Sequence, residues 1–158
     1  MTEDQKLKAR LRTDLNAAMR ARDEVRKSTL RMALSAITNE EVSPGNAGRE
    51  LSDDEIVKVL TREAKKRREA AEAFEAAGRA EQAAAERAEG VVLAEYLPRQ
   101  LSDDELRQLV ASAIAETGAV GMPAMGTVMK AVTPQVAGRA DGKRVAAEVR
   151  RQLAASQG

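Results

Sequence analysis

Apolar residues recur every three to four positions along most of this chain, and this spacing limits its fold more than any other feature. Such a period places apolar side chains on one face of an α-helix. The sequence contains no run of alternating β-branched residues, which would indicate a strand. Ala, Glu, Arg, Lys and Leu dominate, and all of them are strong helix formers. The sequence therefore predicts an all-α protein.

The first two helices are expected on either side of Asp23. Thr2 with Gln5 forms a capping box for the first helix, and Asp23 can cap the second. The loop SPGNAG at residues 43–48 ends the second helix. The side chains expected to face the core at helical spacing are Leu7, Leu11, Leu15, Ala18 and Met19, followed by Val25, Thr29, Met32, Ala33, Ala36 and Ile37.

A third and a fourth helix follow this loop. Ser52 with Glu55 forms a second capping box, and the third helix should end at Gly78, which suits a left-handed stop position. Its expected apolar face carries Ile56, Val59 and Leu60. The fourth helix is expected over residues 80–96, although Gly90 inside it costs about 1 kcal/mol relative to Ala.

A domain boundary is expected just after the fourth helix. Pro98 disfavours helical backbone at Leu97 and so ends this helix. The predicted architecture is an N-terminal four-helix domain, residues 1–96, followed by a C-terminal three-helix domain, residues 97–158. Tyr96 is expected to anchor the hinge, with its ring buried between the domains and its hydroxyl in water.

The fifth helix opens at a third capping box, formed by Ser102 and Glu105, and should end at Gly118. Its apolar face carries Leu106, Leu109, Val110 and Ile114. Residues 51–55 and 101–105 both read LSDDE. A weak internal repeat is one explanation, but we favour convergence, because this sequence makes a good capping box behind an apolar residue.

The last two helices are separated by the turn GRADG at residues 138–142. Pro123 suits the first turn of the sixth helix, and Pro134 should bend or stop it near residues 131–133. Asp141 is the expected cap of the seventh helix. The expected core side chains are Met125, Val128, Met129 and Val132 in the sixth helix, with Val145, Val149 and Leu153 in the seventh.

The composition excludes several kinds of chemistry. Without cysteine there is no disulfide, thiolate metal site or cysteine nucleophile. Without histidine the chain lacks the usual general base, the commonest metal ligand and any Ser-His-Asp triad. A Ser-Lys or carboxylate pair stays formally open, but no spacing supports one. We therefore expect no catalytic residues, no metal ligands and no cofactor, and a lone chain that is inactive on glutamine and ATP.

The beginning of the chain reads MTEDQK, which has no apolar core segment or cleavage site of a signal peptide. No stretch approaches 18 apolar residues, the length needed to cross a bilayer. These features predict a cytoplasmic protein without a membrane partner.

The net charge of +1 hides an uneven distribution. Residues 1–97 hold 18 basic and 19 acidic side chains, whereas residues 118–158 hold six basic and two acidic ones. A basic end on a nearly neutral body suggests an anionic partner. The densest basic run, Lys65–Arg68, is flanked by glutamates at helical spacing and is expected to be a solvated charged face.

Two segments resemble signatures of the GatB/YqeY family, and of its free-standing YqeY-like proteins in particular. Residues 96–102 read YLPRQLS. Residues 125–130 read MGTVMK, followed by Pro134 and by GRADGKRV at residues 138–145.

The resemblance implies that the C-terminal part is similar to the tail domain of the B subunit of glutamine-dependent aminoacyl-tRNA amidotransferase. That enzyme converts mischarged Glu-tRNA or Asp-tRNA to the Gln or Asn form, and its tail helps to hold the tRNA. The kinase cradle and the amidase lie elsewhere in the enzyme, and nothing in this chain matches them. The family label, carbon–nitrogen ligase with glutamine as amido-N-donor, would then be inherited from the larger enzyme.

The candidate nucleic-acid-binding residues are Lys130, Arg139, Lys143 and Arg144. Arg139 and Lys143 lie at or near a helix start, where the dipole and free N–H groups favour a phosphate. With Phe74 and Tyr96 as the only aromatic residues, base stacking is not expected, and recognition should use the RNA shape and backbone.

Gly126, between Met125 and Met129, has two explanations. It can let a neighbouring helix approach while the methionines fill the gap, which we favour, or it can let an RNA backbone approach.

Three functions are compatible with these residues. The first is a tRNA-binding accessory module with modest affinity. The alternative is a helical protein–protein adaptor that uses the same surface or the charged helix around residues 64–77. The third is a component that acts only after joining amidotransferase or synthetase components.

Overall fold

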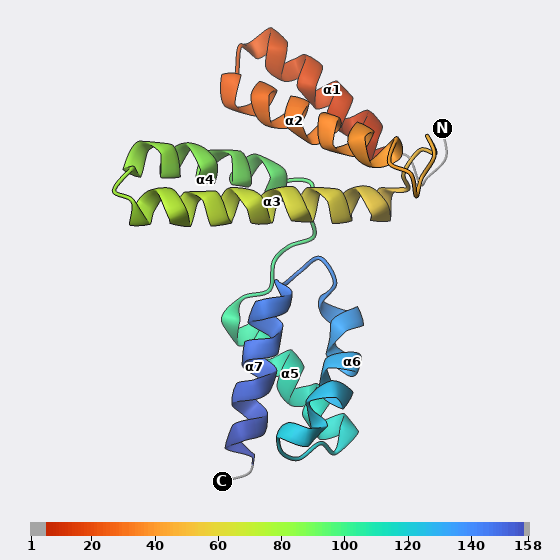
Figure 1. Ribbon diagram of the computed structural model, residues 1–158, viewed down its shortest axis with the longest axis vertical. Helices are drawn as coiled ribbons and strands as arrows, with labels where there is room; N and C mark the ends of the chain where they lie inside the picture. Colours follow the sequence, from red (N-terminus) through yellow and green to blue (C-terminus); the bar gives the residue numbers. More distant parts are fainter. Residues whose placement is uncertain (1–5, 157–158) are drawn as a thin grey trace. The chain divides into compact units, whose positions relative to one another are not determined.

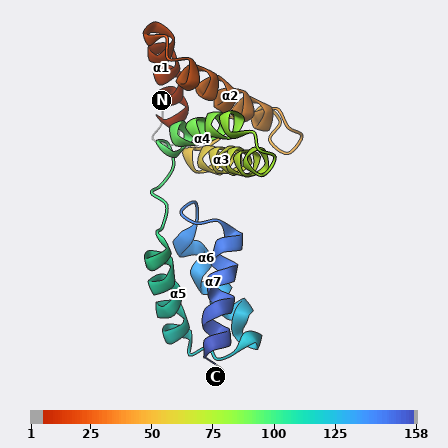
Figure 2. The ribbon, with the colours of Figure 1, turned by 90° about the vertical axis from the view of Figure 1, so that its left-hand side faces the viewer.

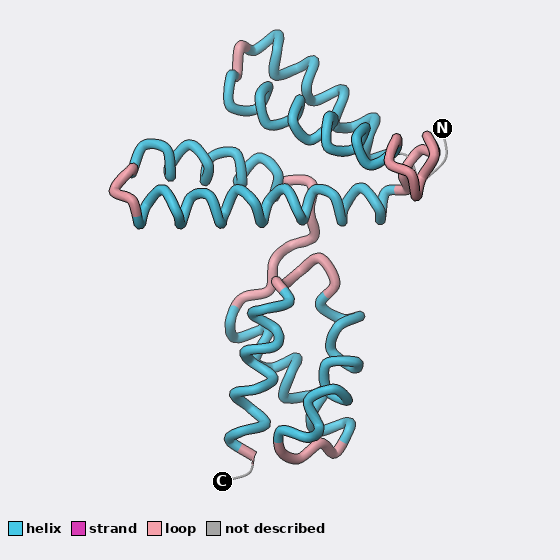
Figure 3. The backbone as a smooth tube through the Cα atoms, viewed as in Figure 1, coloured by secondary structure: helices cyan, strands magenta, loops and turns pink. Residues whose placement is uncertain are grey.

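The computed structural model describes residues 6–156, and within this range it contains seven α-helices and no strand (Figure 1 and Figure 3). The all-α prediction is thus confirmed. The capping box predicted at Thr2 and Gln5 lies outside the described residues.

The backbone forms two compact units, residues 1–97 and 98–158. The helices of the first unit are α1 (Lys6–Ala21), α2 (Glu24–Glu41), α3 (Asp53–Ala76) and α4 (Ala80–Ala94). Those of the second are α5 (Asp103–Thr117), the short 3-10 helix η2 (Met122–Ala124), α6 (Met125–Val136) and α7 (Gly142–Ala155). The division into four-helix and three-helix domains that fold separately stays a prediction.

In the first unit, α1 and α2 form one antiparallel hairpin, and α3 and α4 form another (Figure 1). The core that joins them consists of Leu11, Leu30, Ala33, Ile37, Leu51, Ile56, Val59, Leu60, Val92, Leu93 and Tyr96. Six of these eleven were predicted to face the core, whereas Leu30, Leu51, Val92 and Leu93 were not among the predicted core side chains. Met19 and Val25, predicted to face the core, are 40% and 46% exposed, because both lie on the flank of their helix's buried stripe.

The two LSDDE segments adopt the same local structure. Ser52 and Ser102 each cap a helix with φ −70° and ψ 165°, and each completes a capping box with the glutamate three residues later. In both copies an arginine two residues before the leucine pairs with that glutamate, Arg49 with Glu55 and Arg99 with Glu105. The repeated device is therefore longer than the pentapeptide.

Arg67 corrects the prediction that the run Lys65–Arg68 is a solvated face. Its guanidinium lies between α3 and α4, with nitrogens 3.4 Å from Glu63, 3.4 Å from Glu86 and 3.5 Å from Glu89. Spacing along the sequence identifies only acidic partners in the same helix, such as Glu63. The other two partners, Glu86 and Glu89, belong to α4. Burial and the nearby charge of Glu86 raise the pKa of Glu89.

The second unit packs three helices around one core, with α6 and α7 side by side and α5 behind them (Figure 1 and Figure 2). The buried side chains are Leu101, Leu106, Val110, Ala113, Val128, Val132, Val136, Val145, Val149 and Leu153. Gly118 ends α5 with φ +68°, as predicted.

Two prolines of this unit, Pro123 and Pro134, differ from their predicted roles. Pro123 lies in η2, just before α6. Pro134 does not stop α6, which continues to Val136. A proline in the last turn removes only one helical hydrogen bond, that to the Lys130 carbonyl, so the helix tolerates it.

No single helix among residues 6–156 is both long and apolar enough to span a bilayer. α5 and the segment η2–α6 reach that length and apolarity only together, and they meet at 95°.

Candidate functional site

The four predicted phosphate ligands all lie in the second unit. Lys130 is in the middle of α6, Arg139 is in the turn before α7, and Lys143 and Arg144 belong to the first turn of α7. The side chains of Lys130, Arg139 and Lys143 form no ion pair or hydrogen bond within the part of the chain that the structure describes. Lys130 and Lys143 are exposed, and Arg139 is half-buried.

Arg144 differs from the other three. Its Nη2 donates to the Leu101 carbonyl at 2.7 Å and lies 2.9 Å from Asp103 Oδ1. Arg144 therefore ties the start of α7 to the segment that leads into α5. Its role as a phosphate ligand stays a prediction, while its structural role was not foreseen.

The segment of residues 99–103, here called the strap, crosses the turn between α6 and α7. Gln100 Nε2 donates to the Gly138 carbonyl at 2.9 Å, and the Leu101 N–H donates to the Arg139 carbonyl at 2.8 Å. Arg144 closes the arrangement from α7. The strap thus joins the two signature segments, which are far apart in the sequence, and holds the backbone from which Arg139 and Lys143 extend.

Asp141 caps α7 as predicted, because its Oδ1 accepts the Lys143 N–H at 2.9 Å. This carboxylate lies where a phosphate would meet the first N–H groups of the helix, and its charge opposes an anion there. The predicted advantage of the helix start is therefore reduced. An anion near this turn would meet the side chains of Arg139 and Lys143 instead.

Gly126 contradicts the explanation that we favoured from the sequence. A Cβ atom built at this position would meet nothing within 4 Å, so no neighbouring helix approaches closely there. Gly126 and Lys130, four residues apart, share the exposed face of α6, which carries no acidic side chain. Met125 and Met129 are partly buried against the core, as expected of core side chains.

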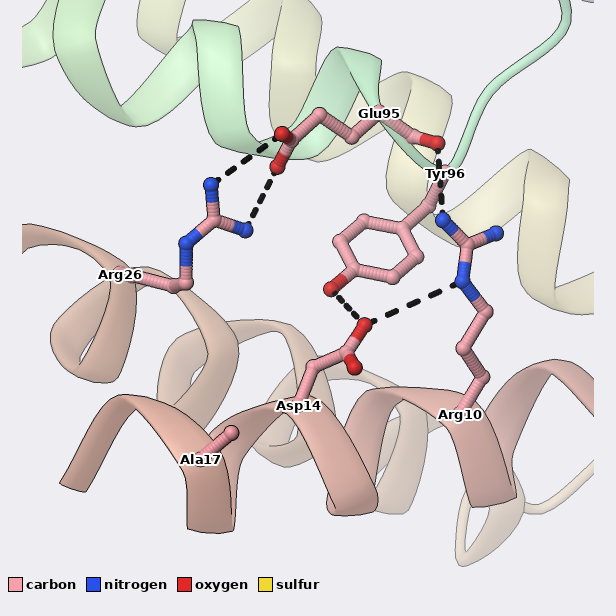
Figure 4. Close-up of a pocket in the computed structure, with 6 residues that line it drawn as sticks. All are labelled: Arg10, Asp14, Ala17, Arg26, Glu95 and Tyr96. Carbon is pink, nitrogen blue, oxygen red and sulfur yellow. Dashed lines mark hydrogen bonds and ion pairs between the residues drawn. The ribbon is translucent and has the colours of Figure 1, made fainter. Parts of the chain in front are cut away.

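A second candidate site is a pocket of about 220 Å³ in the first unit, shown in Figure 4. It is lined by Arg10, Asp14, Ala17, Arg26, Glu95 and Tyr96. Arg10 and Arg26 lie on either side of the Tyr96 ring, and the Arg10 guanidinium lies 4.4 Å from the ring centroid. Arg26 donates from Nη1 and Nη2 to the two oxygens of the Glu95 carboxylate, at 2.6 and 3.1 Å. Arg10 donates from Nη2 to the Glu95 carbonyl at 3.3 Å.

Tyr96 is only 5% exposed and belongs to the core of the first unit, so the prediction of a ring buried between domains is wrong. Its hydroxyl is not in water as expected but donates to Asp14 Oδ2 at 2.5 Å. Burial, together with this hydrogen bond, raises the pKa of Tyr96 to about 12. The polar groups of the pocket contact one another and so join α1, α2 and the end of α4. We call the residues Arg10, Asp14, Arg26, Glu95 and Tyr96 the clasp.

Neither site contains a donor set for a metal. Among the described residues, no three Asp, Glu, His or Cys side chains converge in a way that could hold an ion.

Comparison with known proteins assigns the chain to a family. No curated protein matches the sequence. A family model described as "Yqey-like protein" matches residues 8–153. This range includes the strap, the turn at residues 138–142 and the clasp around Tyr96. Because the match extends over nearly the whole length, the protein belongs to the family of Yqey-like proteins.

Proposed function

We propose that this protein is a tRNA-binding accessory module that holds the RNA backbone with cations of its second unit. The proposal rests on the ion pairs of the second unit, because only half of its basic side chains have an acidic partner in the part of the chain that the structure describes. Four basic side chains of this unit have acidic partners, namely Arg99, Arg107, Arg144 and Arg151. The other four have none within the described residues: Lys130, Arg139, Lys143 and Arg150. Arg150 was not among the candidates chosen from the sequence.

Free cations on a unit without aromatic side chains favour phosphate contacts over base recognition. Arginine and lysine contribute to such binding by releasing the counterions of the phosphates. With only a few groups involved, the affinity should be roughly micromolar at physiological salt. The strap limits the movement of the turn that carries Arg139, so binding would require little ordering of this backbone.

The proposal also includes a relationship to the aminoacyl-tRNA amidotransferase. We place the second unit with the tail domain of the amidotransferase B subunit, and residues 1–96 and 97–158 as separate domains of a cytoplasmic protein. The carbon–nitrogen ligase label would then describe a larger enzyme whose amidotransferase or synthetase components act as partners. The chain itself offers no nucleophile–base pair that would supply this reaction.

The test is a tRNA titration over a series of salt concentrations. The variant Arg139→Ala/Lys143→Ala should bind more weakly and flatten the dependence of log affinity on log salt by about two units. The matched control, Lys65→Ala/Lys66→Ala, removes two lysines that already pair with Glu69 and Glu63, and it should change little.

A larger effect of the control pair would place the tRNA site on the first unit. If tRNA does not bind at low salt, the adaptor alternative replaces the proposal. Glutaminase activity of the purified chain would instead support an amidotransferase component.

A further inference from the structure

The first unit carries a second basic surface, which the total charge of the unit does not reveal. Residues 6–31, which include α1 and the first half of α2, hold nine basic and three acidic side chains, a net charge of +6. The rest of the unit is acidic enough to cancel this excess. A sum over residues 1–97 therefore hides a strongly basic hairpin.

The three acidic residues of this segment all have other partners. Asp14 accepts the Tyr96 hydroxyl, and Asp23 caps α2 by accepting the Arg26 N–H at 3.0 Å. Glu24 pairs with Lys27 at 2.8 Å. These carboxylates stabilise the hairpin and its contact with α4, but they leave several arginines uncompensated.

Four exposed arginines of the hairpin form no ion pair with a carboxylate in residues 6–156: Arg12, Arg20, Arg22 and Arg31. Arg12 acts electrostatically on Glu41 without pairing with it. The Glu41 carboxylate pairs instead with Lys8, whose Nζ lies 2.9 Å from Glu41 Oε1. Most other arginines of the protein have a carboxylate partner.

One of these arginines contacts the exposed side chain of Met19, and the other three lie near Met19 along the sequence. Arg31 of α2 donates from Nη2 to the Met19 sulfur at 3.4 Å, which places both on one side of the hairpin. Arg12 lies seven residues before Met19, two helical turns along the same face of α1. Arg20 and Arg22 follow Met19 directly, at the turn that closes the hairpin. We call these four residues the arginine patch.

Arg22 has a backbone conformation that arginine disfavours. Its φ is +57°, and its N–H donates to the Met19 carbonyl at 3.2 Å in the turn that ends α1. At the corresponding ends of α3 and α5 the left-handed position is taken by glycine, Gly78 and Gly118. Glycine would therefore suit residue 22 better, and the arginine side chain is not explained by the fold.

We propose that the arginine patch binds the phosphate backbone of a nucleic-acid double helix. The guanidinium fork matches phosphate oxygens and is weakly hydrated, so arginine suits this contact better than lysine does. A protein partner would require a larger apolar centre, yet this end of the hairpin exposes only the separate side chains of Met19 and Val25 and has no aromatic residue. The proposal is independent of the tRNA site in the second unit.

The variant Arg22→Gly separates binding from folding. Because it relieves the strained φ, it should raise the midpoint of thermal unfolding. Because it removes one phosphate contact, it should weaken binding of a blunt RNA duplex of arbitrary sequence by roughly three- to tenfold and reduce the salt slope by about one unit. Adding Arg20→Ala should double the change in slope.

The matched control is Arg79→Ala, which removes another exposed arginine without an ion pair among the described residues, at the start of the acidic helix α4. It should leave duplex binding unchanged. Equal effects of Arg22→Gly and Arg79→Ala would overturn the proposal, as would tighter binding of polyglutamate or of anionic vesicles than of the duplex.

The variant Arg139→Ala/Lys143→Ala distinguishes the two surfaces. If it leaves duplex binding intact while Arg22→Gly weakens it, the duplex binds at the patch, and the site in the second unit is then decided by the tRNA titration alone. If only Arg139→Ala/Lys143→Ala weakens binding, the patch proposal fails.

Discussion

Raising the pH above about 10 should destabilise the first unit through one side chain, Tyr96. Its pKa is raised to about 12 from the ordinary value of about 10, so the fold favours the neutral hydroxyl. The resulting stability is fully present below the unfolded pKa of about 10 and is lost as the pH rises to about 12. Ionisation would bring a phenolate against the Asp14 carboxylate within a buried contact.

The magnitude follows from the size of this shift. Two pH units correspond to about 2.7 kcal/mol, and access of solvent to the neighbouring pocket makes this an upper limit, so we expect about 1 to 2 kcal/mol. Lysines titrate over the same range, and they are controlled by comparison with Tyr96→Phe. The free energy difference between wild type and Tyr96→Phe, measured by urea unfolding, should shrink or change sign between about pH 9 and pH 12.

A direct assay is available because Tyr96 is the only tyrosine and the chain has no tryptophan. The near-ultraviolet absorbance of tyrosinate therefore reports on this residue alone. Its midpoint should lie near pH 12 in the folded protein and near 10 in urea. A folded-state midpoint near 10, or a wild-type advantage over Tyr96→Phe that does not change with pH, would refute the role of the Asp14 hydrogen bond.

Two further predictions concern Arg67 and Gln100. Arg67→Met leaves Glu63, Glu86 and Glu89 without their shared cation and should lower the free energy of unfolding by about 3 kcal/mol at neutral pH. The loss should shrink toward pH 5. Burial and Glu86 raise the pKa of Glu89 while Arg67 lowers it, so removing Arg67 raises this pKa further, and the variant gains more stability than the wild type as it binds the proton. Urea unfolding at both pH values tests this, and a loss independent of pH would count against it. Gln100→Ala removes the hydrogen bond to Gly138 and should cost about 1 kcal/mol, seen as roughly fivefold faster exchange of the Leu101 amide. Gln108→Ala on the exposed face of α5 is the control, and equal exchange in the two variants would show that the strap does not depend on Gln100.

Much of the candidate site in the second unit could be predicted from local sequence. Asp141 was predicted as a cap because capping uses N–H groups two or three residues away. The strap could not be predicted, since Gln100 and Gly138 are brought together only by packing of α5 against α6 and α7. The role of Gly126 was misjudged for the same reason, because the sequence does not show whether a helix covers it.

The arginine patch had a signal in the sequence, nine basic against three acidic residues over residues 6–31. Summing charge over the whole first unit hid this signal. Even the correct sum would not identify the patch, because Arg10 and Arg26 belong to the same segment and are paired by Asp14, Asp23 and Glu95.

The sequence by itself determined where most of the helices begin and end and, apart from residues such as Leu30, Met19 and Val25, which of their faces are apolar. Capping boxes at Ser52 and Ser102, and glycines at positions 78 and 118, act through neighbours along the chain. Tertiary structure alone decided which charges are compensated: Arg67 by glutamates of α4, Arg144 by Asp103, and the Tyr96 hydroxyl by Asp14. Hydrogen bonds and ion pairs depend on distance in space, and only helix packing brings these groups together.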